Sequence, residues 1–155
     1  MAGHTDNSVF IDAPLDFVWK RTNDIESWTE LYSEYAAAEV LETNGNRIVF
    51  RLTLHPDENG VSWSWVSERI LDEAAHVTRS TRLETGPFKY MHLFWEYLEE
   101  DGGVRLRWVQ DFEMKPQAPL DDAGMTERLN RNTATQMSLF KSRLEAEAAA
   151  MRRSA

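Results

Sequence analysis

The chain has 155 residues, a formal net charge of -9 at pH 7 and no cysteine. This length suits one domain with one buried core, so we expect residues 1–155 to form a single domain. The missing cysteines exclude disulfides, thiolate nucleophiles and zinc–thiolate centres, and the acidic charge argues against general affinity for nucleic acids or anionic membranes, which need clustered Lys and Arg.

The amino-terminal residues 1–7 contain neither the basic stretch nor the apolar segment of a secretory signal. No apolar run in the chain approaches the roughly 20 residues that a membrane-spanning helix needs. We therefore expect a cytoplasmic protein that does not bind membranes.

The first forty residues predict one strand and two short helices. The strand is expected over residues 7–12. Pro14 suits the first position of a helix, and apolar residues then recur at helical spacing as far as about Thr22. A second helix is expected over about residues 24–31, with Trp28 on its apolar face.

Residues 38–113 alternate between apolar and polar positions, which is typical of strands. Turn signals divide this stretch into about six strands, and they lie at residues 44–45, 57–60, 71–74, 86–87 and 101–103. The alternation is clearest in residues 48–54 and 104–112, and it predicts an antiparallel sheet with one buried face.

Residues 120–151 contain no proline and repeat apolar side chains every three or four positions, which predicts one long amphipathic helix. The predicted fold is therefore α+β, with a strand, two short helices, about six strands and a long helix in chain order. A sheet of about seven antiparallel strands curls, and the terminal helix would close its concave side. The space between them is either core or cavity.

Residues 61–70 are the most informative stretch for function. As a strand, this stretch places Trp63, Trp65, Ser67 and Arg69 on one face. If that face is concave, Arg69 points inward, and a buried cation needs water, a ligand or a carboxylate beside it. The alternatives are that Arg69 reaches the rim of the sheet and that the tryptophans belong to an ordinary core.

Two later strands add further aromatic residues to the same predicted face. Met91 and Trp95 belong to one of them, and Trp108 and Gln110 belong to the last. Three strands would then bring indole rings to one surface, which is more aromatic bulk than a small core usually needs.

Three positions on or near the helices are further candidates. Tyr35 and Trp28 would lie near the mouth of the sheet, where Tyr35 is a candidate proton donor or a ring packed with its hydroxyl in water. Gln136 interrupts the apolar stripe of the long helix, either as a polar group in a pocket or as a tolerated edge position.

Other chemistries lack support in the sequence. The four histidines have no metal-binding spacing, and they are His4, His55, His76 and His92. The chain also lacks the GxSxG, GxGxxG and P-loop motifs. We therefore expect no metal and no cofactor.

Six segments of the chain resemble the monodomain polyketide aromatase/cyclases of bacterial type II polyketide synthases, of the tetracenomycin and spore-pigment type. The segments are residues 22–28, 31–35, 63–69, 84–88, 108–112 and 114–116. The resemblance covers most of the chain. It implies the START-like, Bet v 1-like helix-grip fold, which agrees with the predicted order of elements.

The resemblance also implies a function and a site. The expected activity is cofactor-independent: a linear poly-β-ketone on an acyl carrier protein undergoes aldol closure of its first ring, between carbons 9 and 14, and is dehydrated to an aromatic ring. Arg69 and Tyr35 are the implied catalytic pair. The implied cavity wall consists of Trp28, Trp63, Trp65, Ser67, Phe88, Met91, Trp95, Trp108, Gln110 and Gln136.

Two other readings stay open at this point. A non-catalytic carrier of hydrophobic ligands can have the same fold. A module that mainly docks the acidic acyl carrier protein would need basic residues at its mouth, for which Lys89, Arg82 and Arg51 are candidates.

Overall fold

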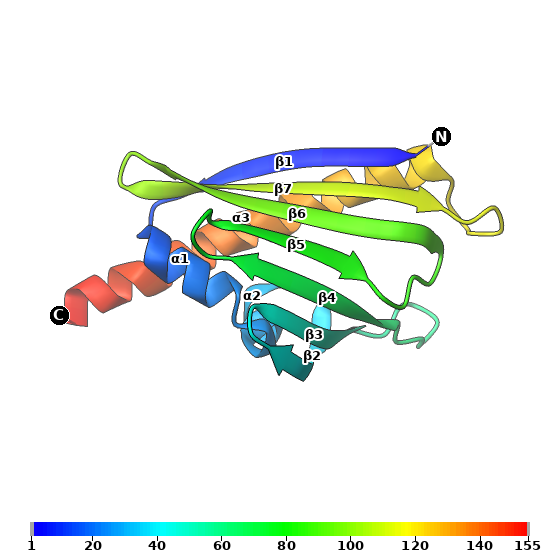
Figure 1. Ribbon diagram of the computed structural model, residues 1–155, viewed down its shortest axis with the longest axis horizontal. Helices are drawn as coiled ribbons and strands as arrows, with labels where there is room; N and C mark the ends of the chain where they lie inside the picture. The colour runs from blue at the N-terminus through cyan, green and yellow to red at the C-terminus, as the bar shows by residue number, and fades with distance from the viewer. Residues whose placement is uncertain (1, 155) are drawn as a thin grey trace.

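One antiparallel sheet and one long helix dominate the computed structural model, which describes residues 2–154 (Figure 1). The strands are β1 (Gly3–Ile11), β2 (Tyr35–Asn44), β3 (Arg47–Leu54), β4 (Ser64–Asp72), β5 (Val77–Arg82), β6 (Phe88–Glu100) and β7 (Gly103–Met114). Their order in the sheet is β1-β7-β6-β5-β4-β3-β2. Strands β2 to β7 are thus a meander, and β1 closes its far edge against β7.

Tight turns set the register of the two longest hairpins. Gly45 joins β2 to β3 with a φ of 63°, and Asp101 and Gly102 join β6 to β7 with φ values of 48° and 79°. Two-residue hairpin turns of this kind need positive φ, which Gly adopts without strain and Asp tolerates better than most residues. These turns confirm the signals read from the sequence at residues 44–45 and 101–103.

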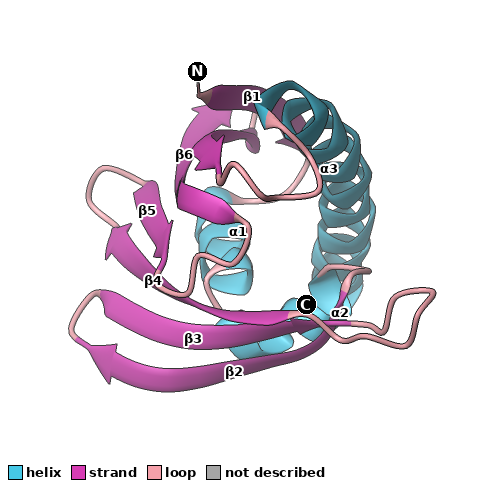
Figure 2. Ribbon diagram, turned by 90° about the vertical axis from the view of Figure 1, so that its right-hand side faces the viewer, coloured by secondary structure: helices cyan, strands magenta, loops and turns pink. Residues whose placement is uncertain are grey.

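The helices lie on the concave side of the sheet. They are α1 (Leu15–Thr22), the 3-10 helix η1 (Ile25–Ser27), α2 (Trp28–Leu31) and α3 (Asp122–Ser154). Figure 2 shows the sheet curving around this space, with α3 spanning it from β1 towards α2. The long helix is too polar to cross a membrane, and no other helix among residues 2–154 qualifies.

Arginines fasten the short helices to α3. The guanidinium of Arg143 donates to the backbone oxygens of Glu30 and Leu31, at 2.7 and 2.8 Å. Arg21 in α1 donates through Nε to Glu147 at 2.9 Å. Because a helix of one turn has little stability of its own, α2 depends on this anchoring for its position.

The buried side chains form two groups along the concave face. The larger group surrounds Trp95 and includes the rings of α1, α2 and the middle of α3. The smaller group consists of Phe88, Met91, Phe112, Met114 and Met125. Polar side chains of β4, β5 and β7 are also buried on this face, and they are Ser67, Arg69, Thr78, Ser80 and Gln110.

The predicted fold is confirmed, including the seven strands, the two short helical segments and the long helix. Several boundaries differ from the prediction, and β2 begins at Tyr35 rather than near residue 38. Strand β1 begins at Gly3 because it pairs with β7 along its full length, down to Phe112. Helix α3 begins at Asp122, and the second helical segment is split between η1 and α2.

Candidate active site

Strand β4 carries Arg69 into the interior, where its side chain is 1% exposed. Alternation along the strand also buries Ser67 and leaves the intervening Glu68 to pair with Arg47 on the outer face, at 2.9 Å. The guanidinium carbon of Arg69 lies 4.5 Å from the ring centroid of Trp95 and 5.3 Å from that of Trp28. The predicted inward orientation of Arg69 is therefore confirmed, with aromatic faces stabilising the cation.

The hydrogen-bond partners of Arg69 are neutral. Its Nε donates to Asn23 Oδ1 at 2.9 Å, and its Nη1 donates to Ser80 Oγ at 3.4 Å. Its Nη2 is buried and has no hydrogen-bond partner among the described residues. Burial lowers the pKa of the guanidinium, and Tyr97 and Tyr32 oppose this shift. An arginine stays protonated even so, and the interior therefore contains a positive charge with an unused donor.

Aromatic rings pack around this charge. The centroid of Trp95 lies 4.9 Å from that of Trp108 and 6.3 Å from that of Trp28, whose ring is stacked on it at 13°. Tyr32, which follows α2, and Phe140 of α3 continue the cluster, with centroids 4.7 Å apart. We call these five rings and Tyr35 the aromatic cluster.

The unpaired buried polar atoms of the described chain lie in and around the aromatic cluster. Five buried side-chain atoms have no hydrogen-bond partner within residues 2–154, and they are Arg69 Nη2, Thr78 Oγ1, Arg82 Nε, Trp95 Nε1 and Trp108 Nε1. All five come from neighbouring strands, β4 to β7. Buried unpaired donors are rare in ordinary cores because each one loses its hydrogen bonds to water. Their concentration here is typical of a site that binds a polar ligand.

Tyr35 lies at the start of β2 with its ring in the aromatic cluster. Its centroid is 4.6 Å from Tyr32 and 6.3 Å from Trp28. Because Trp28 also contacts Arg69, both members of the predicted pair, Arg69 and Tyr35, lie against one indole ring. Burial raises the pKa of the Tyr35 hydroxyl well above its ordinary value of 10.0, so it holds its proton at neutral pH.

Arg82 is a second interior cation that the sequence analysis placed among the docking residues. It ends β5, opposite Ser67 in the register, and its guanidinium carbon lies 4.3 Å from the centroid of Trp65 and 5.1 Å from that of Phe88. Burial lowers its pKa to about 10, while Tyr35 and Glu84 oppose the shift. The signal in the sequence was the alternation of Thr78, Ser80 and Arg82, which puts Arg82 on the buried face of its strand.

Gln110 is buried and forms hydrogen bonds with two threonine side chains. Its carbonyl oxygen accepts hydrogen bonds from the hydroxyls of Thr5 and Thr133, at 2.8 and 3.2 Å. The register sets Gln110 opposite Leu93, which lies opposite Ser80 in turn. The predicted inward orientation of Gln110 is thus confirmed.

Gln136 fastens a loop to α3. Its carbonyl oxygen accepts from the backbone N–H of Ser33 at 3.0 Å, and its amide nitrogen donates to Ser33 Oγ at 3.0 Å and to Asn132 Oδ1 at 3.5 Å. Asn132 in turn donates to Glu34 Oε2 at 3.1 Å. Both the oxygen and the nitrogen of the Gln136 amide are therefore hydrogen-bonded. Together with the bond from Asn132, they hold Ser33 and Glu34, the two residues that precede Tyr35, against α3.

Glu34→Gln is expected to flatten the pH dependence of stability. Burial raises the pKa of the Glu34 carboxyl above its ordinary value of 4.5, and the hydrogen bond from Asn132 opposes the shift. The folded state therefore binds more protons than the unfolded state just above pH 4.5, and the free energy of unfolding falls as pH rises through the raised pKa. Urea unfolding from about pH 4 to about pH 7 measures this, and an unchanged slope in the variant would contradict it.

Trp63 does not join the site, so the expectation that it lies on the inward face is wrong. It precedes the first residue of β4, its side chain is 57% exposed, and its Nε1 donates to Asp57 Oδ2 at 3.1 Å. Asp57 also accepts the backbone N–H groups of Asn59 and Val61, both at 2.9 Å. The loop organised by Asp57 therefore sets the orientation of Trp63, and the inward and outward alternation of side chains begins only at Ser64.

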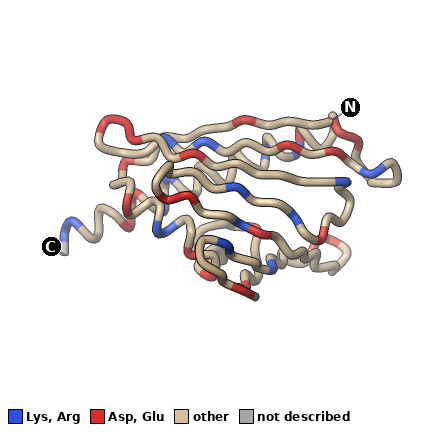
Figure 3. The backbone as a smooth tube through the Cα atoms, viewed as in Figure 1, with Lys and Arg blue, Asp and Glu red and all other residues tan. Residues whose placement is uncertain are grey.

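The remaining predicted wall residues divide between the two groups. Trp65 is half-buried beneath Arg82, while Phe88 and Met91 belong to the smaller group with Phe112. The proposed docking residues do not form a free basic patch, since Lys89 pairs with Glu113 at 2.6 Å and Arg51 with Glu84 at 3.2 Å. Figure 3 shows basic and acidic residues interspersed along the strands.

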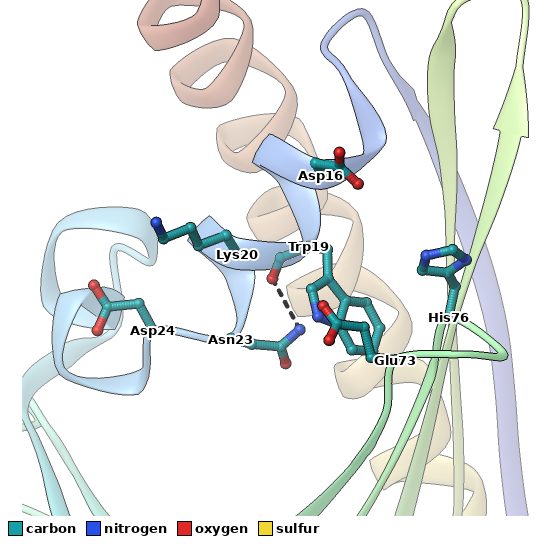
Figure 4. A pocket seen from close by; sticks show the side chains of 7 residues that line it. All are labelled: Asp16, Trp19, Lys20, Asn23, Asp24, Glu73 and His76. Atoms are coloured by element: carbon teal, nitrogen blue, oxygen red, sulfur yellow. Dashed lines mark hydrogen bonds between the residues drawn. The ribbon is translucent and has the colours of Figure 1, made fainter. Parts of the chain in front are cut away.

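Two pockets open outside the aromatic cluster. We call the larger one, of about 470 Å³, the end pocket, and it is lined by Asp16, Trp19, Lys20, Asn23, Asp24, Glu73 and His76 (Figure 4). A pocket of about 220 Å³ lies between Pro14 and Phe17 of the α1 region and Ala148, Met151 and Arg152 of α3. Between sheet and helix, where the sequence allowed a core or a cavity, the rings of the aromatic cluster contact one another.

Comparisons with known proteins agree with this architecture. The model of a family described as polyketide cyclase / dehydrase and lipid transport matches residues 11–140. A Streptomyces cyaneus protein, provisionally named a polyketide cyclase, is 58% identical over 145 residues, 94% of this chain and 95% of the relative.

Two solved structures share the fold. The aromatase/cyclase Zhui from a Streptomyces species superposes with a TM-score of 0.79 at 23% identity, covering 96% of this chain and 94% of that one. A START superfamily protein from Mycobacterium smegmatis has a TM-score of 0.71 at 14% identity, covering 96% and 98%. The helix-grip fold is therefore confirmed.

Proposed function

Because the chain belongs to the polyketide cyclase/dehydrase and lipid transport family, we propose that it is an aromatase/cyclase that folds a linear poly-β-ketone between its sheet and α3. The observation that carries the proposal is the buried cation of Arg69, with neutral partners and an unused Nη2 donor, surrounded by aromatic rings. A poly-β-ketone has a carbonyl oxygen at every second carbon, and these oxygens match the unpaired donors. The ligand takes its place by parting the rings of the aromatic cluster.

In the proposed first step, the enolate of one ketide methylene attacks a distant carbonyl carbon. A carbon–carbon bond forms, and the carbonyl oxygen becomes an alkoxide that takes up a proton. Arg69 stabilises the developing negative charge because its cation is fixed in a place from which water is largely excluded. Arg69 retains its own proton throughout, since its basicity is too high for proton transfer at neutral pH.

Tyr35 is the proposed proton donor to the new alkoxide, and the tyrosinate that results takes up, through water, the proton that the methylene lost when the enolate formed. Its hydroxyl is protonated at neutral pH, and its ring is held by Tyr32 and Trp28. Arg82, on the same side of the sheet, supplies a second positive charge close to Tyr35. Dehydration then removes the new hydroxyl group and one neighbouring hydrogen as water, and enolisation of the two remaining ring ketones completes the aromatic ring.

The aromatic side chains select the product in this proposal. Poly-β-ketones close in many ways, so a protein directs the reaction by holding one conformation of the chain. The rings of Trp28, Trp65, Trp95 and Trp108 supply flat apolar walls for that purpose. We assign the first closure to carbons 9 and 14 and the delivery of substrate to an acyl carrier protein, in line with the family resemblance.

The test uses a synthase that makes the linear poly-β-ketone. Three reactions are compared: one without this protein, one with the wild-type protein and one with the Tyr35→Phe variant. Wild type is expected to replace the spontaneous mixture with one dominant aromatic product. Tyr35→Phe keeps the ring packing and the site of closure, and it is expected to slow product formation about 10²-fold, as loss of a general acid does.

A carrier of hydrophobic ligands is the rival function, and the family description includes lipid transport. A carrier would bind the poly-β-ketone and prolong its lifetime without changing the product mixture. Equal mixtures with and without wild-type protein would therefore overturn the aromatase/cyclase proposal.

A further inference from the structure

The end pocket lies at the opposite end of β4 from the loop that holds Trp63. Three of its lining residues come from α1, Asn23 and Asp24 follow that helix, and Glu73 and His76 come from the turn between β4 and β5 (Figure 4). The charged side chains of its lining are mostly acidic, since Asp16, Asp24 and Glu73 outnumber Lys20, and the pocket is open to solvent.

Asn23 connects this pocket with the buried cation. It lines the end pocket, and its Oδ1 accepts the hydrogen bond from Arg69 Nε at 2.9 Å. Its Nδ2 donates to the backbone oxygen of Trp19 at 2.9 Å, which closes the end of α1 (Figure 4). The Asn23 side chain also interacts with the hydroxyl of Tyr97.

Trp19 extends the same partition. It lines the end pocket, and its ring centroid lies 4.9 Å from that of the buried Tyr97. The hydroxyl of Tyr97 is hydrogen-bonded to Thr22 Oγ1 at 2.6 Å, so this part of the wall is firmly packed. Asn23 is the small polar member of the partition, and a change of its side-chain torsions breaks its hydrogen bonds to Arg69 and to the backbone of Trp19.

We propose that the end pocket is a water port for the Arg69 site, opened when the Asn23 side chain swings away from Arg69. Such water would take the place of Asn23 Oδ1 at Arg69 Nε, and the same guanidinium also carries the unused Nη2 donor. The port also gives the water released by dehydration a way out that the bound ketide does not block, and this last role rests on the proposed function.

The absence of cysteine permits a direct test with a single thiol reporter. Ser80→Cys places the thiol beside Arg69, since Ser80 Oγ lies 3.4 Å from Nη1. Its rate of modification by methyl methanethiosulfonate, which is small and neutral, measures access to the interior. In this background, Asn23→Ala is expected to raise the rate about tenfold because the partition loses both of its hydrogen bonds.

Filling the port should have the opposite effect. Glu73→Trp changes an exposed side chain in the pocket wall, and it is expected to slow labelling of Ser80→Cys about tenfold both with Asn23 and with Asn23→Ala. Glu58→Trp is the matched control, since Glu58 is exposed in the loop at the other end of β4, and it should leave the rate unchanged. A labelling rate that Glu73→Trp does not change would contradict the proposed port. The same conclusion would follow if Glu58→Trp lowered the labelling rate as much as Glu73→Trp.

The product distribution supplies a separate readout. In the cysteine-free chain, Glu73→Trp is expected to increase the share of cyclised but undehydrated product without moving the site of ring closure. If wild type forms no cyclised product, the proposed function fails while the labelling experiment still decides whether the port exists. If labelling supports the port and the product ratio does not change, its role in dehydration is wrong.

Discussion

Arg69→Met is expected to remove control over the cyclised product while leaving the protein folded. The substitution eliminates the interior cation and keeps a side chain of similar length among Trp28, Trp95 and Ser80. Loss of a fixed group that stabilises a developing oxyanion lowers rates by about 10²–10³-fold. We expect that loss in the formation of the directed product, with the spontaneous mixture appearing in its place.

Stability should respond very differently from activity. A buried charge with neutral partners costs desolvation, so its removal offsets the two hydrogen bonds that Asn23 and Ser80 lose. The free energy of unfolding should therefore change by less than about 2 kcal/mol. Arg69→Lys is the matched control, because lysine retains the positive charge but lacks the planar set of N–H donors of arginine. This variant should have more activity than Arg69→Met and less than wild type.

Urea unfolding and product analysis on the same preparations measure both quantities. A variant that loses several kcal/mol of stability together with its activity would identify Arg69 as a structural residue. A stable Arg69→Met variant that still gives the wild-type product would contradict its assigned role in catalysis.

Trp95→Ala is expected to cost about 3–5 kcal/mol of folding free energy, the usual range for a fully buried aromatic residue. Trp95 is 1% exposed and contacts Trp28, Trp108 and Phe140, besides supporting the Arg69 cation. Its removal leaves a cavity where β6 meets the helices. The surrounding rings are too large and too constrained by one another to fill that space.

Trp63→Ala is the matched control for the loss of an indole. Because Trp63 is 57% exposed and contributes one hydrogen bond to a surface loop, its loss should cost about 1 kcal/mol or less. Far-ultraviolet circular dichroism in urea follows both variants without relying on tryptophan fluorescence. Equal destabilisation by the two substitutions would contradict the packing described for Trp95.

The alternation of residues predicted the inward face of the sheet correctly wherever a strand was regular. Arg69, Trp95 and Trp108 were placed in this way, because a period of two leaves only two faces to choose from. The prediction failed at Trp63, which precedes the first residue of β4 although its backbone oxygen still accepts a hydrogen bond from Leu54 of β3. No periodicity marks that boundary, since it depends on Asp57 and the loop that it organises.

Tertiary contacts decided the positions that the sequence left open. Arg82 was a candidate docking residue, and it is partly buried because its strand lies between those of Arg69 and Trp95. Gln136 was expected on the cavity wall, yet its amide is used by Ser33 and Asn132. The partners of Gln136 have no signature in local sequence, since Ser33 lies in a distant part of the chain.

The central claim is that a ligand binds among the rings around Arg69, and the indole N–H signals test it most directly. Titration of nitrogen-15-labelled protein with a planar polyhydroxylated aromatic product analogue should shift the signals of Trp95 and Trp108, whose Nε1 atoms are buried and unpaired in the described chain. The signal of Trp63, which is bonded to Asp57 on the surface, should stay in place. Movement of the Trp63 signal with Trp95 and Trp108 unchanged would contradict the account.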